Sequence, residues 1–195
     1  MWTYIPEEFS FLLKTFQNVD HQKAHVLYVF NKKNESRPLY ASVLTRFLPK
    51  LEQAHISRSS DIVLQITARL SLYAFRTQDN TLLQRLWTQF VLSYDVSTLS
   101  PRGIHNCIII GLLTNKASTK HFNQLISTVP QTNILLQITL ALQDVMDITQ
   151  AIQLCDQHFQ NQEIQILPWS DEPLLGVYEL LYEKKGMSWP TSVQT

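Results

Sequence analysis

Two pairs of histidine and cysteine residues at helical spacing are the first features of this sequence that could do chemistry. His21 and His25 are four residues apart, and Cys155 and His158 are three apart, so each pair would share one face of a helix. A structural zinc site needs four ligands in a tetrahedral array, and each pair supplies two. No third ligand accompanies either pair. We therefore predict neither a bound metal nor a cofactor.

A thiol nucleophile is the second chemical possibility, because His105-Asn106-Cys107 contains the residue types of a cysteine-based active site. Successive helical residues point roughly 100° apart, so these three cannot form a triad among themselves. We expect Cys107 to be buried and inert. Asp144, Asp147 and Asp156 could hold a cation, but we expect them to solvate helix ends. The prediction is that the chain is not an enzyme.

Several function classes are disfavoured by what the sequence lacks. Phosphate-binding loops need closely spaced glycines, and the four present are far apart: Gly103, Gly111, Gly176 and Gly186. The two cysteines form no Cys-x-x-Cys pair, which favours reduced thiols and an intracellular location. The N-terminus lacks the basic and apolar segments of a secretory signal. The longest apolar run, Ile104 to Leu113, is too short to span a membrane.

Charge is scarce and unevenly distributed along the chain. Charged residues make up 16% of the sequence and the net charge is zero, whereas average proteins carry roughly 25% charged residues. Residues 1–120 hold 14 Lys and Arg against 8 Asp and Glu, and residues 121–195 hold 2 against 8. This asymmetry favours a polyanionic or acidic partner for the first part, or self-association through the oppositely charged halves. The candidate partner-binding or RNA-binding residues are Lys23, Lys32, Lys33, Arg37, Arg46 and Arg58.

Two further sets of residues bear on partner binding. Tyr28, Tyr40 and Phe47 lie among the basic residues and could stack on unpaired bases, but they also fit apolar helical stripes and could belong to the core. Trp2, Trp169 and Trp189 lie outside the helical stripes and are candidates for protein docking, because Trp is enriched at interface hot spots. Alternatively, these tryptophans cap the open ends of a helical stack.

The elements that must position these residues read as helices throughout, with apolar residues recurring at spacings of three and four. Ser36-Arg37-Pro38 resembles a cap followed by an early proline, and Pro49 should bend or end the helix that follows. Ser59-Ser60-Asp61 predicts another helix start, and Ser100-Pro101 is the clearest. A last helix should begin at 170–173 and stop at Gly186.

A weak internal repeat organises these helices. Leu64–Leu70 and Leu136–Leu142 share the pattern Leu-Gln-Ile-Thr and lie 72 residues apart. We expect four helix pairs, at 18–56, 59–97, 99–129 and 131–160, because repeats of this length are typical of helical solenoids. The predicted fold is all-α, with antiparallel pairs stacked as a short α-solenoid; the alternative is an irregular helical bundle. Residues 1–160 would form the helical-repeat domain, and 161–195 a C-terminal capping segment with one helix and a tail.

Two stretches carry a family resemblance. Ser60–Phe75 and Leu99–Leu113, the second opening with Leu-Ser-Pro-Arg, resemble the helix-pair repeats of the octotricopeptide and FAST-kinase-like group. Thr67-Ala68 and Cys107-Ile108 stand where first helices of that group often have a Trp-Ala pair. The resemblance implies an α-solenoid and contact with RNA in an organelle.

The sequence as a whole predicts a non-catalytic helical-repeat scaffold or adaptor that binds another macromolecule as a subunit of a larger complex. The alternative is a helical-repeat RNA-binding protein that uses the basic N-terminal face, within an organellar ribonucleoprotein. The two hypotheses differ in their expected response to salt, since binding through phosphates weakens steeply as salt concentration rises.

Overall fold

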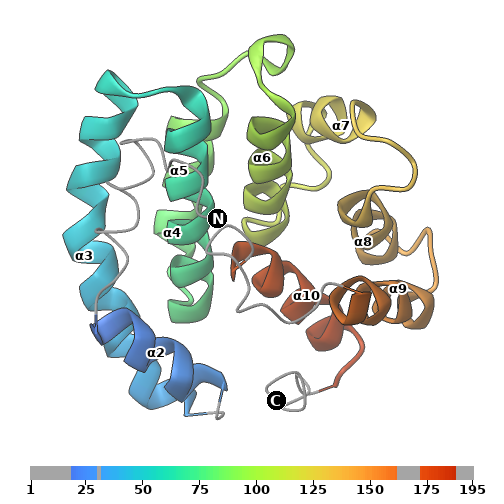
Figure 1. Cartoon of the computed structure of the whole chain (residues 1–195), viewed down its shortest axis with the longest axis horizontal. Helices are drawn as coiled ribbons and strands as arrows, with labels where there is room; N and C mark the ends of the chain where they lie inside the picture. The colour runs from blue at the N-terminus through green and yellow to red at the C-terminus, as the bar shows by residue number, and fades with distance from the viewer. Residues whose placement is uncertain (1–18, 30–31, 162–171, 188–195) are drawn as a thin grey trace, which may run out of the picture.

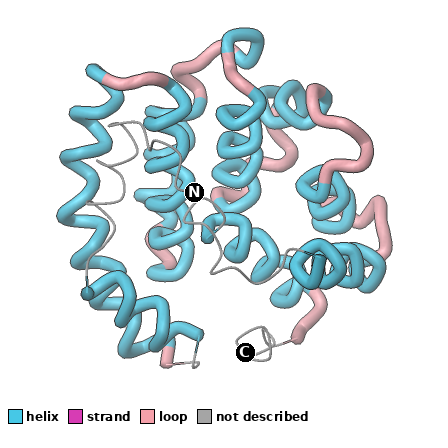
Figure 2. Tube along the Cα trace, in the orientation of Figure 1, coloured by secondary structure: helices cyan, strands magenta, loops and turns pink. Residues whose placement is uncertain are grey.

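The computed structural model describes residues 19–29, 32–161 and 172–187, and all regular secondary structure within these ranges is helical (Figures 1 and 2). Trp2, Trp169 and Trp189, the candidate docking tryptophans, lie outside the described residues. The all-α fold class is confirmed. None of the helices in the described ranges combines the length and hydropathy that crossing a bilayer requires.

The first described helices pack side by side at one edge of the molecule. They are α2 (Val19–Val29), α3 (Lys33–Ser57) and α4 (Ser60–Thr77), and α3 contacts both of the others. Residues at spacings of one, three and four make the buried stripe of α3, the pattern of one helical face: Tyr40, Val43, Leu44, Phe47, Leu51 and Ala54. The predicted pair 18–56 therefore corresponds to α2 and α3.

The structure contradicts the expected cap of α3 and one of the two outcomes expected at Pro49. Ser36 is not its cap: the helix begins at Lys33, and the buried Ser36 hydroxyl donates to the Lys33 carbonyl at 3.0 Å. Pro49 does not end it, because α3 continues to Ser57. A proline leaves the carbonyl four residues earlier without its N–H partner. Here that residue is Thr45, which is exposed, so water can bind the carbonyl.

The central helix is α4, which is buried along nearly its whole length and contacts α3, α5 and α6. It stops at Thr77 because Gln78 takes a left-handed conformation, with φ of 61°. The Asp79 carboxylate then accepts from the Leu82 N–H at 2.9 Å and caps α5 (Asn80–Leu86). A π-helical turn, Trp87–Val91, and a short 3₁₀ turn, Val96–Thr98, complete this region.

The start of α6 (Pro101–Leu113) confirms the cap predicted from Ser100-Pro101. The Ser100 hydroxyl oxygen accepts from the Gly103 N–H at 3.0 Å, and its proton is donated to Asp61 at 2.5 Å. The following α7 (Lys120–Ser127) packs against α6. Gly111 of α6 lies directly against the ring of Phe122, and a methyl group there would overlap the ring.

The remaining helices are α8 (Ile134–Leu142), α9 (Ile148–Asn161) and α10 (Glu172–Lys184). α10 returns to the middle of the molecule and contacts α4, α6, α8 and α9 (Figure 1). Gly176 lets it approach α4 closely, because a methyl group at this position would overlap Leu72. After α10, Gly186 takes a φ of +72°, consistent with the predicted helix stop.

Helices that follow one another in the chain are in contact both within the predicted pairs and between them, since α3 also packs on α4. The grouping into four pairs stays a prediction. α4 packs on α5, α6 on α7, and α8 on α9, in the ranges predicted from the sequence. α4 and α6, the first helices of two successive predicted pairs, also pack on each other. A regular solenoid and the division at residue 160 stay predictions. α10, which belongs to the predicted capping segment, lies against helices from three of the predicted pairs.

Candidate functional site

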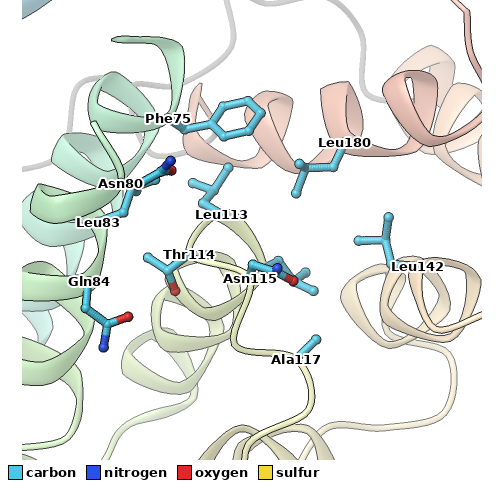
Figure 3. Close-up of a pocket in the computed structure, with 11 residues that line it drawn as sticks. Phe75, Asn80, Leu83, Gln84, Leu113, Thr114, Asn115, Ala117, Leu142 and Leu180 are labelled. Atoms are coloured by element: carbon cyan, nitrogen blue, oxygen red, sulfur yellow. The ribbon is translucent and has the colours of Figure 1, made fainter. Parts of the chain in front are cut away.

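The candidate site is a pocket of about 610 Å³ enclosed by the corner between α4 and α5, the end of α6, α8 and α10 (Figure 3). A volume in this range is typical of ligand-binding clefts. Its lining side chains come from residues far apart in sequence: Phe75, Asn80, Leu83, Gln84, Leu112, Leu113, Thr114, Asn115, Ala117, Leu142 and Leu180.

The pocket has an apolar floor and a polar rim. Leu83, Leu112 and Leu113 are buried at the floor, and the half-buried Phe75, Leu142 and Leu180 extend the apolar surface. The exposed side chains on the lining are carboxamides, from Asn80, Gln84 and Asn115. Figure 3 shows Asn80 and Gln84 on α5 and Asn115 just beyond the end of α6, next to Thr114. This arrangement can bind an apolar group and hydrogen-bond its polar neighbour.

None of the eleven lining residues is ionisable. Thr114 supplies a hydroxyl, but this group donates to the Ile110 carbonyl at 2.8 Å and so satisfies the end of its own helix. General acid–base catalysis needs a titratable group within hydrogen-bond reach of the substrate. The lining of this pocket therefore suits binding and does not supply acid–base chemistry.

A buried ion pair stands directly behind the pocket wall. The Arg76 guanidinium donates to the Glu179 carboxylate at 2.6 Å, and the two side chains are 1% and 7% exposed. Their sequence neighbours Phe75 and Leu180 line the pocket. The ion pair thus joins α4 to α10 and sets the distance between two walls of the pocket.

Further charged groups extend this pair into a cluster shared by α4, α10 and α2. Glu172 lies 3.7 Å from both Arg69 and Arg76, and 3.5 Å from the ring nitrogen of His25. Buried charges are costly unless they are paired and hydrogen-bonded, and here each carboxylate meets a guanidinium. The name ionic cluster is used for these charged residues together with three tyrosines: Arg69, Arg76, Glu172, Glu179, His25, Tyr28, Tyr40 and Tyr73.

Three tyrosines complete the ionic cluster. Tyr28 donates to Glu179 at 2.9 Å, Arg76 donates to the Tyr40 oxygen at 2.7 Å, and the Tyr73 hydroxyl lies 3.5 Å from Glu172. Tyr40 and Tyr73 stack with their ring centroids 5.1 Å apart. Each hydroxyl thereby brings a polar atom to the charges while its ring fills the core.

Burial dominates the electrostatics of the ionic cluster. Desolvation raises the pKa of Tyr28, Tyr40 and Tyr73 above the ordinary value, and nearby carboxylates raise it further. Burial by itself would lower the pKa of Arg76, but Glu179, Tyr40 and Glu172 raise that pKa well above its ordinary value. The cluster therefore keeps Arg76 charged and its three tyrosines neutral at physiological pH.

Neither the pocket nor the ionic cluster was predicted from the sequence. A signal for the cluster was present: Arg69 and Arg76 are seven residues apart within an apolar helix, and so are Glu172 and Glu179. A spacing of seven places two residues on one helix face. The pocket left no comparable signal, because its walls come from four separate segments.

The candidate basic residues are exposed for the most part but do not form one compact patch. Lys32, Lys33 and Arg37 share the beginning of α3, whereas Arg46 and Arg58 lie about 20 and 37 Å further along at 1.5 Å per residue. Lys23 is exposed on α2.

Two of these charges have acidic partners: Lys32 lies 3.6 Å from Glu35, and Arg46 lies 3.6 Å from Asp20. The interleaved aromatic residues belong to the core, as the alternative interpretation held. Tyr40 and Phe47 are buried and Tyr28 is half-buried.

The candidate chemical groups are dispersed. Cys107 is buried, as predicted, and desolvation raises the pKa of its thiol to about 12. Cys155 is also buried, and its pKa is likewise raised to about 12. A thiol with such a pKa is protonated at neutral pH and a poor nucleophile. Among the described residues, no group of three or more metal-binding side chains comes together.

Each of the three aspartates considered for a cation has a different partner. Asp144 pairs with Lys184 at 2.6 Å, and Asp156 accepts from the Tyr182 hydroxyl at 3.1 Å. Asp147 accepts from the Gln150 N–H at 3.0 Å and so satisfies the first turn of α9, the role expected of it.

A smaller hollow of about 440 Å³ contains a serine, an aspartate and a histidine, and so invites comparison with a catalytic triad. The Ser97 hydroxyl donates to Asp95 at 2.9 Å, whereas a triad needs the serine bonded to the histidine. The Nε2 atom of His121 is buried without a hydrogen-bond partner. This hollow does not have the geometry of a nucleophile and its base.

Comparison of the chain with protein-family models, curated proteins and solved structures gives no match. The resemblance to the octotricopeptide and FAST-kinase-like group stays a prediction.

Proposed function

We propose that this chain is a non-catalytic helical scaffold that binds a partner protein within a larger intracellular assembly. The observation that carries the proposal is the pocket between α5, α6, α8 and α10, whose described lining is apolar and carboxamide and contains no ionisable side chain. Such a lining suits recognition, because apolar contact supplies affinity and a few placed polar groups supply orientation.

The distribution of exposed apolar side chains adds support. Ile56, at the end of α3, is 88% exposed, and Val145, in the turn after α8, is 71% exposed. Leu92, at the end of the π-helical turn, is 44% exposed. Single exposed apolar residues are common, but these three mark helix ends at the periphery of the stack, where a subunit would meet its neighbours.

RNA binding is the second candidate function, and one observation favours it. Lys32, Lys33 and Arg37 occupy the first turns of α3, and Lys23 is exposed on α2. Such residues can neutralise phosphates. Against this, Lys32 and Arg46 already have carboxylate neighbours, and the interleaved aromatic residues are partly or fully buried.

The experiment that tests the proposal is capture of partners from native lysate with and without RNase, followed by rebinding of the purified partner. Three baits are compared: the unmodified chain, a variant with Lys23→Glu, Lys32→Glu and Lys33→Glu, and a control with Lys120→Glu and Lys185→Glu. All five lysines are exposed.

We expect a protein set that survives RNase, is retained by all three baits, and includes a component that rebinds when purified. Recovery that collapses with RNase and with the first variant, while the control variant still binds, would replace the scaffold with the RNA-binding alternative.

A further inference from the structure

We infer that the pocket receives an uncharged segment of the partner protein, which inserts an aliphatic or aromatic side chain and pairs its backbone with the carboxamides of the rim. The inference rests on the proposed function and specifies the chemistry of the partner.

The floor of the pocket sets the first requirement. Leu83, Leu112 and Leu113 are buried beneath a space of about 610 Å³, larger than a single side chain needs. Phe75 and Leu180 face this space across the floor (Figure 3). Burying an apolar side chain here removes its surface from water, a gain of roughly 25 cal/mol per Å². Leucine, phenylalanine and tryptophan are the side chains that would gain most.

The rim sets the second requirement. Asn80, Gln84 and Asn115 each offer one carbonyl acceptor and two N–H donors. A peptide backbone offers one donor and one acceptor per residue and needs both satisfied when it is buried. Carboxamides can meet either need without a change in protonation. The rim therefore complements a stretch of main chain better than it complements a hydrocarbon or an ion.

The charges around the pocket set the third requirement. Arg76 points to Glu179, and the Lys184 ammonium is held by the Leu142 carbonyl at 2.6 Å and by Asp144 at 2.6 Å. Neither cation is among the lining groups. A charged side chain entering the pocket would lose water without gaining a counter-charge, which is costly. Charge complementarity therefore selects an uncharged partner segment.

The pocket is preformed. The Arg76–Glu179 pair fixes α4 against α10, so Phe75 and Leu180 are positioned before any partner arrives. The Lys184 contacts with Ala141 and Leu142 fix the end of α8 against the end of α10. Preorganised walls reduce the ordering cost that binding must overcome.

The test uses single-residue probes and the side-chain amide signals of the rim. Four blocked amino acids are titrated into the ¹⁵N-labelled chain: N-acetyl-tryptophanamide and N-acetyl-leucinamide as neutral probes, and N-acetyl-lysinamide and N-acetyl-glutamic acid amide as charged ones. The side-chain NH₂ signals of Asn80, Gln84 and Asn115 are followed by NMR. We expect these signals to shift with the neutral probes, and the charged probes to bind at least about tenfold more weakly.

Two substitutions locate the effect. Ala117→Phe fills the pocket and should weaken the neutral probes at least about tenfold, whereas Ala41→Phe, on the exposed face of α3, should leave them unchanged. Gln84→Glu adds a charge at the exposed rim without filling the pocket. This variant should improve binding of the lysine probe relative to the glutamate probe.

The outcomes separate the inference from the proposed function. Equal binding of charged and neutral probes, or neutral binding that leaves the three amide signals unmoved, overturns the inference. If no probe binds while the purified partner still does, the pocket is not the partner's site and the scaffold function stands. If both the probes and every partner protein fail to bind, the scaffold function falls as well.

Discussion

The ionic cluster and the pocket are built by the same two helices and have opposite chemistry. α4 and α10 supply Arg76 and Glu179 to the cluster, and they supply Phe75 and Leu180, the adjacent residues, to the pocket. On one side, charge is concentrated, buried and paired. On the other, the described lining contains no ionisable group at all.

This contrast shows how the chain uses its scarce charge. Buried ion pairs add little net stability, since desolvation offsets most of their attraction, but a mispaired buried charge is heavily penalised. Two arginines and two glutamates, each seven residues apart, therefore specify one register of α10 against α4. The pocket can then be uncharged, because the cluster, and not the pocket lining, fixes its walls.

The largest expected effect comes from breaking the cluster. Arg76→Met should destabilise the fold by about 3–5 kcal/mol, because it leaves the buried Glu179 carboxylate without its positively charged partner. Urea denaturation measures the loss. The double variant Arg76→Met with Glu179→Met should lose less than Arg76→Met alone. A loss below about 1 kcal/mol for the single variant would contradict the claim that the cluster fixes α10.

The unfolding free energy should fall at alkaline pH because of the tyrosines of the ionic cluster. Burial raises the folded-state pKa of Tyr28, Tyr40 and Tyr73 above the ordinary value of 10, so the folded state keeps protons that the unfolded state loses. Their contribution is complete below pH 10 and is lost as pH rises above it, at about 1.4 kcal/mol per pH unit for each tyrosine. Unfolding free energies at pH 8, 10 and 11 measure this slope. Cys107, Cys155 and Tyr182 also have raised pKa values and add to the slope, so Tyr40→Phe should reduce it by the share of one group, about 1.4 kcal/mol per pH unit. An unchanged slope would place Tyr40 outside the titration.

A smaller effect is expected where cluster and pocket meet. Gly176→Ala would place a methyl group on Leu72 of α4 and 3.2 Å from Leu113 of the pocket floor. We expect a loss of about 1–3 kcal/mol from overpacking, in spite of the better helix propensity of alanine. The same variant should weaken the neutral probes, because α10 must shift. Leu72→Ala as a second change should recover part of both losses; simple additivity would argue against the contact.

The smallest effect is expected at the pocket rim. Gln84→Glu introduces a charge at an exposed position and should change the unfolding free energy by less than about 0.5 kcal/mol. Thermal denaturation of Gln84→Glu, Arg76→Met and the unmodified chain under the same conditions compares the two losses of stability directly. A large loss from Gln84→Glu would show that the rim, like the cluster, depends on its charge state for folding.

Helix starts were predictable from the sequence where the residues that fix them are neighbours in the chain. Ser100-Pro101 indicated the start of α6, and its cap forms as expected, because a hydroxyl next to Pro at the first helical position acts within four residues. Ser36-Arg37-Pro38 carries a similar signature, but the Ser36 hydroxyl donates to Lys33 inside a helix that has already begun. The two sites differ in where their helices begin: α3 begins three residues before Ser36, whereas α6 begins directly after Ser100. The residue types at the two sites do not reveal this difference.

Tertiary features were not predictable in the same way. The partners in the Arg76–Glu179 pair are 103 residues apart, and those in the Tyr28–Glu179 bond are 151 apart. Periodicity shows that each side chain lies on a helix face, but it does not show which faces meet. The pocket forms only where four separate segments pack together, so it depends on the packing of the helices and not on any single segment.

The central position of α10 has a consequence for how the chain is made. Every described helix that α10 contacts is synthesised before it, and at roughly 5–20 residues per second the wait from α4 to α10 lasts several seconds or more. During that time Arg69 and Arg76 have no glutamate partners from α10, and the surface that α10 will cover stays open. The nascent chain is therefore most exposed to misassociation, and to capture by chaperones, just before α10 leaves the ribosome.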